Sequence, residues 1–192
     1  MHLAKRGLRA LGIAESFSGR TISTMAGVVM RKDLRIDGVA IASLTVGGTD
    51  ATGAVLSIVA SLGRRDINVV MVSGSVVAWY NILDPEVISG RTGLPLIVVT
   101  YEDSDGLEGD IIHHFPGDEE RLRAYRNLGE RVPVLLKDGS RVFIRPSGLS
   151  TEDASRILRD FTRDGKIPEP VRVARLVARG AMRWHRDTGT TP

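Results

Sequence analysis

Two acidic residues stand where this chain could hold a metal ion. Glu15 follows an apolar segment at residues 8–14 that is typical of a strand, and Asp50 begins an amphipathic segment that is typical of a helix. Carboxylates that converge at the ends of neighbouring elements bind magnesium, which orients water and neutralises charge in phosphodiester cleavage. Each residue also has a simpler interpretation, as a polar strand end for Glu15 and a helix cap for Asp50. The residue types alone leave both interpretations open.

Five arginines form a second candidate site, on the last predicted helix. They are spaced 3, 4, 4 and 3 residues apart, which predicts one stripe along the helix: Arg172, Arg175, Arg179, Arg183 and Arg186. The opposite side is expected to be apolar: Val173, Leu176, Val177, Gly180 and Trp184. No acidic residue occurs between Pro170 and Arg186. Such a stripe suits phosphate contacts, although a solvated face and an acidic patch on a partner subunit are alternatives.

The sequence argues against several other chemistries. It contains no cysteine, which excludes thiol catalysis, disulfides and cysteine-bound metal. His113 and His114 lie in an acidic, Gly-rich segment at residues 102–117, which we expect to be an exposed loop without metal-site spacing. The serines show no accompanying histidine and aspartate of the kind that a serine hydrolase requires.

The elements that must position these side chains follow from hydrophobic periodicity. Three apolar segments separated by short turns predict antiparallel strands, at residues 8–14, 21–30 and 36–46. Helical and wholly apolar segments then alternate, which is typical of helices joining strands buried on both faces: 47–63, 67–74, 84–93 and 94–101. Asp84, before Pro85, is expected to cap the second of these helices. This order predicts a ribonuclease H-like α/β fold, a mixed sheet of three antiparallel strands followed by parallel strands and covered by helices. The first, fourth and fifth strands are expected side by side at its centre.

The remaining segments predict a helix at residues 118–128, a small hairpin around Asp138 and Gly139, a helix capped by Ser150, and the arginine helix. We therefore expect one domain over residues 1–186 and a disordered tail at residues 187–192. The formal charge of +3 and the pI of about 9.6 are compatible with nucleic acid. No apolar run approaches the roughly 18 residues of a membrane span, so we expect a cytoplasmic protein without a membrane partner.

Four stretches resemble a known family: "GGTDAT", "WYNILD", "TGLPLIVV" and "GKIPEPVRVARLVARG". They are similar to the archaeal endonuclease dU family, which is related to endonuclease V. The resemblance covers most of the chain. It implies a ribonuclease H-like fold and cleavage of DNA near a deaminated base, deoxyuridine, with Mg²⁺ or Mn²⁺.

The chain departs from the family where the family binds metal. The family's first strand ends in Gly-Ile-Asp-Asp, whereas here the residues are Gly12, Ile13, Ala14 and Glu15. A middle strand of the family ends in Asp-Gly, and here Ser73 replaces that aspartate. The resemblance thus implies that Ala14 and Ser73 are degenerate positions, and that Glu15 falls on the family's second acidic position.

Two hypotheses follow. In the first, the chain is an endonuclease whose catalytic and metal-binding residues are Glu15 and Asp50. In the second, it is a catalytically degenerate module that binds nucleic acid or another protein, with nucleic acid held by Arg172, Arg175, Arg179 and Arg183. A homodimer is compatible with both. We expect Ala14, Glu15, Asp50 and Ser73 to lie in one shallow cleft, where aspartates at positions 14 and 73 would restore metal binding.

Overall fold

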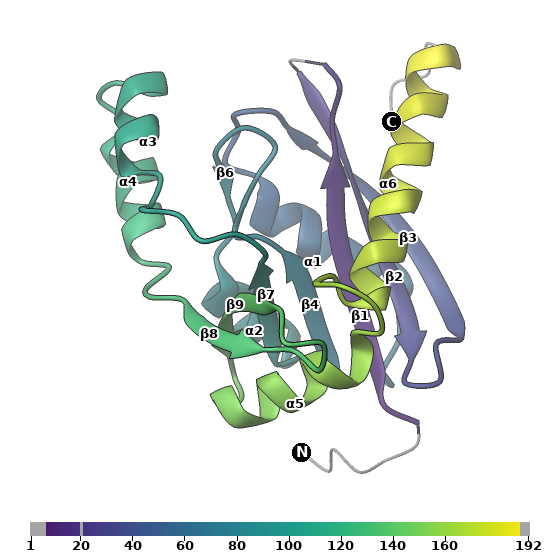
Figure 1. The fold of residues 1–192 in the computed structure, drawn as a ribbon. Coiled ribbons are helices and arrows are strands. Elements are labelled where there is room, and N and C mark those ends of the chain that lie inside the picture. The colour runs from purple at the N-terminus through teal and green to yellow at the C-terminus, as the bar shows by residue number, and fades with distance from the viewer. Residues whose placement is uncertain (1–6, 20, 189–192) are drawn as a thin grey trace.

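The strands of the first half of the chain and a later hairpin form one mixed sheet (Figure 1). The computed structural model describes residues 7–19 and 21–188. Within them, seven strands lie in the order β3-β2-β1-β4-β7-β9-β8. Their bounds, in that order, are Ile36–Thr45, Ile22–Arg31, Arg9–Ser16, Val69–Ser73, Leu96–Thr100, Arg141–Ser147 and Val132–Leu135. A separate two-stranded ribbon pairs β5 (Val76–Val77) with β6 (Asn81–Ile82). The predicted ribonuclease H-like fold class is confirmed.

The centre of the sheet agrees with the predicted strand order. Strands β1, β4 and β7 are parallel neighbours, and β1 to β3 form the expected antiparallel meander. The predicted small hairpin is present as β8 and β9, and its strand β9 also pairs antiparallel with β7, which extends the main sheet. Val142 and Ile144 of β9 are fully buried, so the hairpin is stabilised by its packing within the main sheet.

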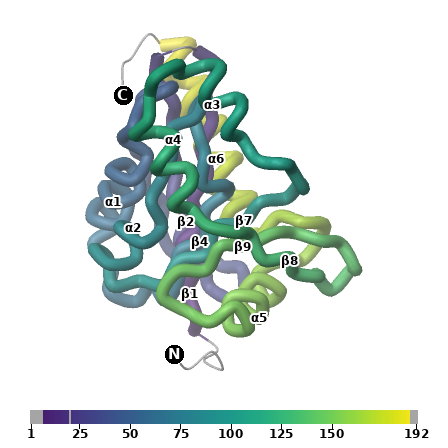
Figure 2. Tube along the Cα trace, turned by 90° about the vertical axis from the view of Figure 1, so that its left-hand side faces the viewer, coloured from purple at the N-terminus to yellow at the C-terminus, as the bar shows by residue number. Residues whose placement is uncertain are grey.

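Helices cover both faces of the sheet (Figure 2). On one face lie α1 (Ala51–Leu62) and α2 (Pro85–Thr92), and on the other lie α5 (Thr151–Phe161) and α6 (Glu169–Thr188). Two further helices, α3 (Glu108–His114) and α4 (Glu119–Arg126), follow β7. The prediction of a loop at residues 102–117 is therefore wrong over α3. Ile111 explains the difference, because this apolar residue is buried and anchors the short helix.

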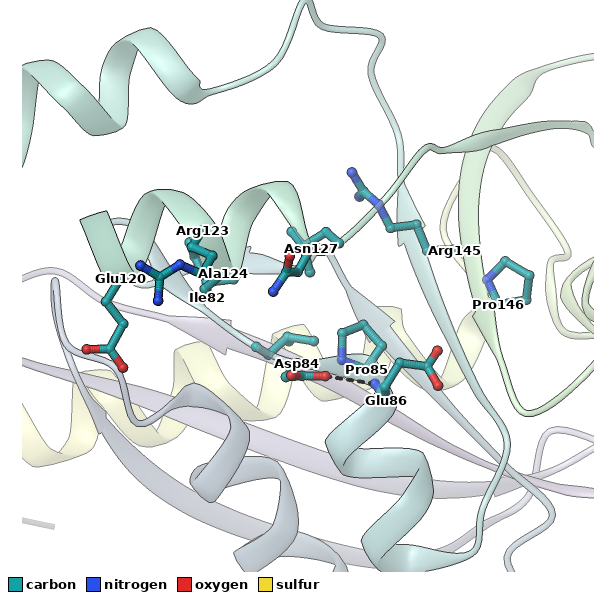
Figure 3. A pocket seen from close by; sticks show the side chains of 12 residues that line it. Ile82, Asp84, Pro85, Glu86, Glu120, Arg123, Ala124, Asn127, Arg145 and Pro146 are labelled. Carbon is teal, nitrogen blue, oxygen red and sulfur yellow. Dashed lines mark hydrogen bonds between the residues drawn. The ribbon is translucent and has the colours of Figure 1, made fainter. Parts of the chain in front are cut away.

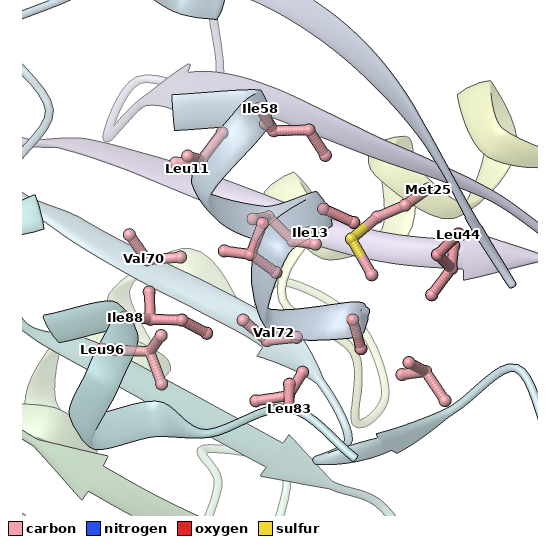
Figure 4. Close-up of a cluster of buried hydrophobic side chains, with 14 of the residues drawn as sticks. Leu11, Ile13, Met25, Leu44, Ile58, Val70, Val72, Leu83, Ile88 and Leu96 are labelled. Carbon is pink, nitrogen blue, oxygen red and sulfur yellow. The ribbon is translucent and has the colours of Figure 1, made fainter. Parts of the chain in front are cut away.

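Two apolar layers result from the alternation of side chains along each strand. In β1, Leu11 and Ile13 face α1 and α2, together with Val70 and Val72 of β4 (Figure 4). Ala10 and Ala14 face α5 and α6 on the other side. Small residues on that side leave room for a helix to approach closely.

The first turn of α6 lies against the backbone of β1. A Cβ atom built on Gly12 would lie 2.2 Å from the carbonyl carbon of Pro170, closer than any real contact. Glycine is therefore required where the two backbones meet. Beyond this point α6 runs alongside β1 and β2 (Figure 1).

The buried face of α6 differs in part from the predicted one, since Val173 and Val177 pack against the core as expected. Val171, Ala174 and Ala178 are fully buried, whereas Leu176 and Trp184 of the expected apolar side are 55% and 58% exposed. The close approach at Gly12 explains this rotation, because only small side chains fit between the helix and the sheet. Each of these buried residues directly precedes an arginine of the stripe in the sequence. One edge of the arginine stripe therefore faces the sheet.

Helix α6 extends to the end of the described part of the chain. The helix continues through Thr188, so Asp187 and Thr188 of the predicted tail are helical, and residues 189–192 lie outside the described part of the chain. Across residues 7–19 and 21–188, no helix is both long enough and apolar enough to cross a membrane.

Substitution at Gly12 tests the close contact. Gly12→Ala is expected to lower the free energy of unfolding by about 1–3 kcal/mol, because the new methyl group must push α6 away from β1. Gly53→Ala in α1 is the matched control: nothing lies within 4 Å of its Cβ position. Alanine in a helix should instead raise the stability, by up to about 1 kcal/mol. Urea unfolding of both variants measures the difference, and equal effects would contradict the contact.

Candidate functional site

Ala14, Ser73 and Arg175 meet on the α6 side of the sheet. The register Ile13↔Val72 makes Ala14 and Ser73 neighbours at the carboxyl ends of β1 and β4. Arg175 reaches down from α6 and donates from Nη2 to Ser73 Oγ at 2.8 Å. Its guanidinium also lies 5.5 Å from the ring centroid of Tyr101, within cation–π range. Burial raises the pKa of Tyr101, which keeps the phenol neutral.

Glu15 lies on the opposite face of the sheet from Ala14. Its Oε2 accepts a hydrogen bond from Ser23 Oγ at 2.6 Å, and its Oε1 accepts from the backbone N–H of Ala78 at 3.3 Å. The carboxylate thus ties β1 to β2 and to the turn between β5 and β6. These contacts give Glu15 a structural role in the described part of the chain.

Asp50 also faces the α1 side, and it folds back on the end of β3. It accepts from the N–H of Thr45 at 3.1 Å, from Thr45 Oγ1 at 2.8 Å and from Asn81 Nδ2 at 2.6 Å. Asp50 occupies the N-cap position of α1, but its side chain makes no cap hydrogen bond to that helix. Partial burial raises the pKa of Asp50, but hydrogen bonds from Asn81 and Thr45 outweigh this effect and the net pKa is lowered.

The four predicted metal-site positions are therefore divided between the two faces of the sheet instead of sharing one cleft. Ala14 supplies a methyl group, and the hydroxyl of Ser73 is bonded to a cation. Within residues 7–19 and 21–188, no group of three His, Cys, Asp or Glu side chains could hold a metal ion. Mg²⁺ and Mn²⁺ require converging oxygen ligands. The residues present do not fit either ion, because a guanidinium stays charged and repels a divalent cation.

The arginine stripe is not uniform. Arg172 is ion-paired with Glu169, a buried carboxylate just before the acid-free stretch, and Arg186 pairs with Asp187 at 3.0 Å. Arg175 turns toward Ser73. Arg179 and Arg183 are exposed, and neither has an ion pair or hydrogen bond within the described residues. Only these two arginines of the stripe present free charge to solvent.

A strained turn between β5 and β6 was not predicted from the sequence. Ala78, Trp79 and Tyr80 have φ of 40°, 60° and 60°, a left-handed conformation that costs about 1–2 kcal/mol per residue for side chains other than glycine. No glycine marks the turn, so the sequence carries no signal for it. Such strain persists where surrounding structure enforces it, and it clusters at functional sites.

Arg121 of α4 enforces this turn. Its buried side chain donates to the carbonyl oxygen of Tyr80, to that of Gly48 at 3.0 Å and to that of Gly47 at 2.9 Å. The guanidinium also lies 4.0 Å from the ring centroid of Phe115. One arginine thus ties α4 to the strained turn and to the loop before α1.

Two cavities lie beside β9. One is lined by α2 and α4 and holds Asp84, Glu120 and Arg123 (Figure 3). Asp84 accepts from the N–H of Glu86 at 2.9 Å and of Val87 at 3.0 Å, so its predicted role as a cap is confirmed.

The second cavity lies at the carboxyl ends of β4 and β7. It is lined by Gly74, Ser75, Thr100, Arg131 and Arg145, among others. Burial lowers the pKa of Arg145, and the neighbouring charge of Arg131 lowers it further. Arg131 is ion-paired with Asp103 at 3.4 Å, whereas Arg145 has no ion pair within the described residues and donates to the carbonyl oxygen of Gly129 at 3.0 Å. The charge that could attract an anion to this cavity is therefore that of Arg145. The hairpin that supplies Arg145 was not expected to join the sheet.

The fold places the protein in the ribonuclease H-like class. The endonuclease V of Ciona intestinalis, solved with inosine-containing DNA, has the same fold, with a TM-score of 0.62, 13% identity, and coverage of 93% of this chain and 87% of that chain. A protein of unknown function from Archaeoglobus fulgidus gives a TM-score of 0.79 at 26% identity, over 91% of this chain and 98% of that one.

The chain belongs to the Endonuclease dU family, whose profile matches residues 6–182. A "UPF0215 protein" of Pyrobaculum calidifontis is 39% identical over 176 residues, which are 91% of this chain and 97% of the relative. The resemblance proposed from the four sequence stretches is confirmed.

Aspartates introduced at positions 14 and 73 test whether the cation of Arg175 prevents metal binding at this edge of the sheet. In Ala14→Asp/Ser73→Asp, we expect the carboxylate introduced at position 73 to pair with Arg175, so Mn²⁺ binding stays weak. Adding Arg175→Gln removes the competing cation and should raise the Mn²⁺ affinity at least tenfold in titration calorimetry. Arg179→Gln in its place is the control and should change little. Tight Mn²⁺ binding with Arg175 intact would contradict the assignment, and thermal melting checks that each variant is folded.

Proposed function

We propose that this chain binds nucleic acid on a nuclease fold whose metal site has been lost. The main support for this proposal is the 2.8 Å hydrogen bond from Arg175 to Ser73, beside Ala14. A cation contributed by the protein thus lies where the resemblance to the family implies acidic ligands. A bound phosphate would meet a fixed guanidinium there instead of a hydrated metal.

The charges of the surface support nucleic acid as the partner. Arg179 and Arg183 project from α6, and Arg131 and Arg145 line the cavity at the same edge of the sheet as Ser73. Arginines contact phosphates through two N–H groups at once, which gives affinity without sequence information. DNA in the Ciona endonuclease V complex supports the same class of ligand. Deaminated DNA is the ligand that the family name favours.

This binding needs no chemical step. The arginines would position the phosphate backbone, and Tyr101 would keep Arg175 oriented through its ring. The cytoplasmic location and the homodimer stay predictions of the sequence.

A second candidate is a metal-dependent endonuclease that cuts near deoxyuridine with Mg²⁺ or Mn²⁺, using Glu15 and Asp50. The family match over residues 6–182 favours it. A cleavage assay separates the two candidates, with deoxyuridine DNA, both metals and a family member that keeps its aspartates as positive control. Our proposal expects no product above background from this chain, and cutting at a rate comparable to the control would favour the enzyme.

The salt dependence of binding tests the arginine contacts. Each lost phosphate contact should reduce the slope of log affinity against log salt by about one. We expect this reduction for Arg179→Gln and again for Arg183→Gln. Arg163→Gln is the matched control, since Arg163 is also exposed and unpaired within the described residues but follows α5.

Fluorescence anisotropy with labelled single-stranded and duplex DNA, at several salt concentrations, gives these slopes. Wild-type protein that binds neither DNA would overturn the proposed function. Equal slopes for the wild type and both α6 variants would exclude these two arginines from the interface.

A further inference from the structure

Two exposed aromatic side chains line one hollow near the end of β1. Phe17 follows β1 and is 40% exposed, and Trp79 in the strained turn is 47% exposed. Both line a cavity together with Gly19 and Val46. Two of the four residues that line the hollow are therefore aromatic, and both are partly exposed to solvent.

Trp79 is held in a left-handed conformation with about half of its side chain in solvent. Three consecutive residues other than glycine have positive φ, and the middle one is the exposed tryptophan. Part of the indole ring packs on His114, with ring centroids 4.9 Å apart, and the rest lies in solvent. The strained turn thus holds aromatic surface where a ligand can reach it.

The turn is braced from three directions, which makes the ring a rigid surface. Glu15 accepts from the N–H of Ala78 at 3.3 Å, and the carbonyl of Ala78 accepts from Gly47 at 2.8 Å. Arg121 holds the carbonyl of Tyr80 from α4. His114 of α3 lies behind the indole, with ring centroids 4.9 Å apart. A ring fixed in advance loses little conformational entropy when a flat ligand stacks on it.

The exposed arginines of α6 belong to the helix that contacts the end of β1, where the hollow begins. Ser16, next to Phe17, contacts Met182 of α6 through its hydroxyl at 3.7 Å. Arg183 follows Met182 directly, and Arg179 lies one helical turn earlier. A ligand with anionic groups on one side and flat apolar groups on the other matches this combination. Single-stranded nucleic acid has these properties, because its phosphates are charged and its unpaired bases have free faces.

We propose that Trp79 is a stacking platform for an unpaired nucleobase, with Phe17 as a second aromatic side chain of the subsite. The inference rests on the proposed nucleic-acid binding and assigns to it a site that the arginines alone do not provide. Stacking is tolerant of sequence, because every base has a π-face. A paired base inside a duplex cannot reach the ring, so the platform favours single strands and unpaired positions.

Substitution of the two tryptophans tests the platform, since the chain contains only Trp79 and Trp184. Trp79→Leu keeps an apolar side chain and the same backbone requirement but removes the ring. Trp184→Leu is the matched control on the outer face of α6, where the ring is 58% exposed. Trp79→Phe keeps a ring and should retain most of the binding. Thermal melting verifies that each variant is folded.

The probes are two labelled oligonucleotides of equal length, one of deoxythymidines and one of abasic sites with the same phosphates. Wild-type protein should bind the base-bearing strand about tenfold more tightly than the abasic strand, from the stacking of one base. Trp79→Leu should abolish this difference and leave the salt slope unchanged, whereas Trp184→Leu should preserve it. In Trp184→Phe protein, Trp79 is the sole tryptophan, and its fluorescence should be quenched by the base-bearing strand only.

The outcomes separate this inference from the proposed function. If the wild type binds both strands equally, with a normal salt slope, the platform is wrong while the phosphate contacts stand. If the deoxythymidine strand binds without quenching Trp79, the hollow is open to another occupant, such as a protein segment, and the inference is also overturned. If neither strand binds at any salt concentration, both proposals fail together.

Discussion

The contact between Gly12 and the backbone of Pro170 determines the geometry on which the site depends. Because a strand backbone and a helix backbone meet there without an intervening side chain, α6 lies unusually close to β1. The helix can then bury only small residues, Ala174 and Ala178 among them. The same rotation turns Arg175 toward the sheet, at the point where β1 and β4 end, and leaves Arg179 and Arg183 in solvent.

The α6 side and the α1 side of this sheet edge carry different kinds of side chain. On the α6 side, Arg175, Ser73 and Tyr101 form a cationic group next to the methyl of Ala14. On the α1 side, Glu15 and Asp50 stabilise the strained turn and the start of α1, since their oxygens accept hydrogen bonds from Ala78, Thr45 and Asn81. Carboxylates engaged in this way support a binding surface. They do not converge as the ligands of a divalent cation must.

Periodicity and caps predicted the meander, the parallel strands at the centre and the helix starts at Asp84 and Ser150, because these features depend on local sequence. The hairpin pairing of β9 with β7 depends on distant burial and was missed. The apolar face of α6 was misplaced in part, since periodicity gives a stripe but not how closely the helix approaches the sheet. The positive φ of Trp79 carries no sequence signal, and Arg121, which enforces it, lies 42 residues further along the chain. The positions of Ala14 and Ser73 were noticed only through the family resemblance, and the partner of Ser73 was not foreseen.

We propose that the guanidinium of Arg175, and not a metal ion, occupies the edge of the sheet between β1 and β4. Crystals soaked in Mn²⁺ and measured at its absorption edge test this directly, because anomalous scattering locates the ion independently of any activity. We expect the guanidinium of Arg175 within hydrogen-bonding distance of Ser73, and no Mn²⁺ peak near Ala14, Glu15 or Ser73. A Mn²⁺ ion bound at Ser73 or Glu15, with Arg175 displaced, would contradict it.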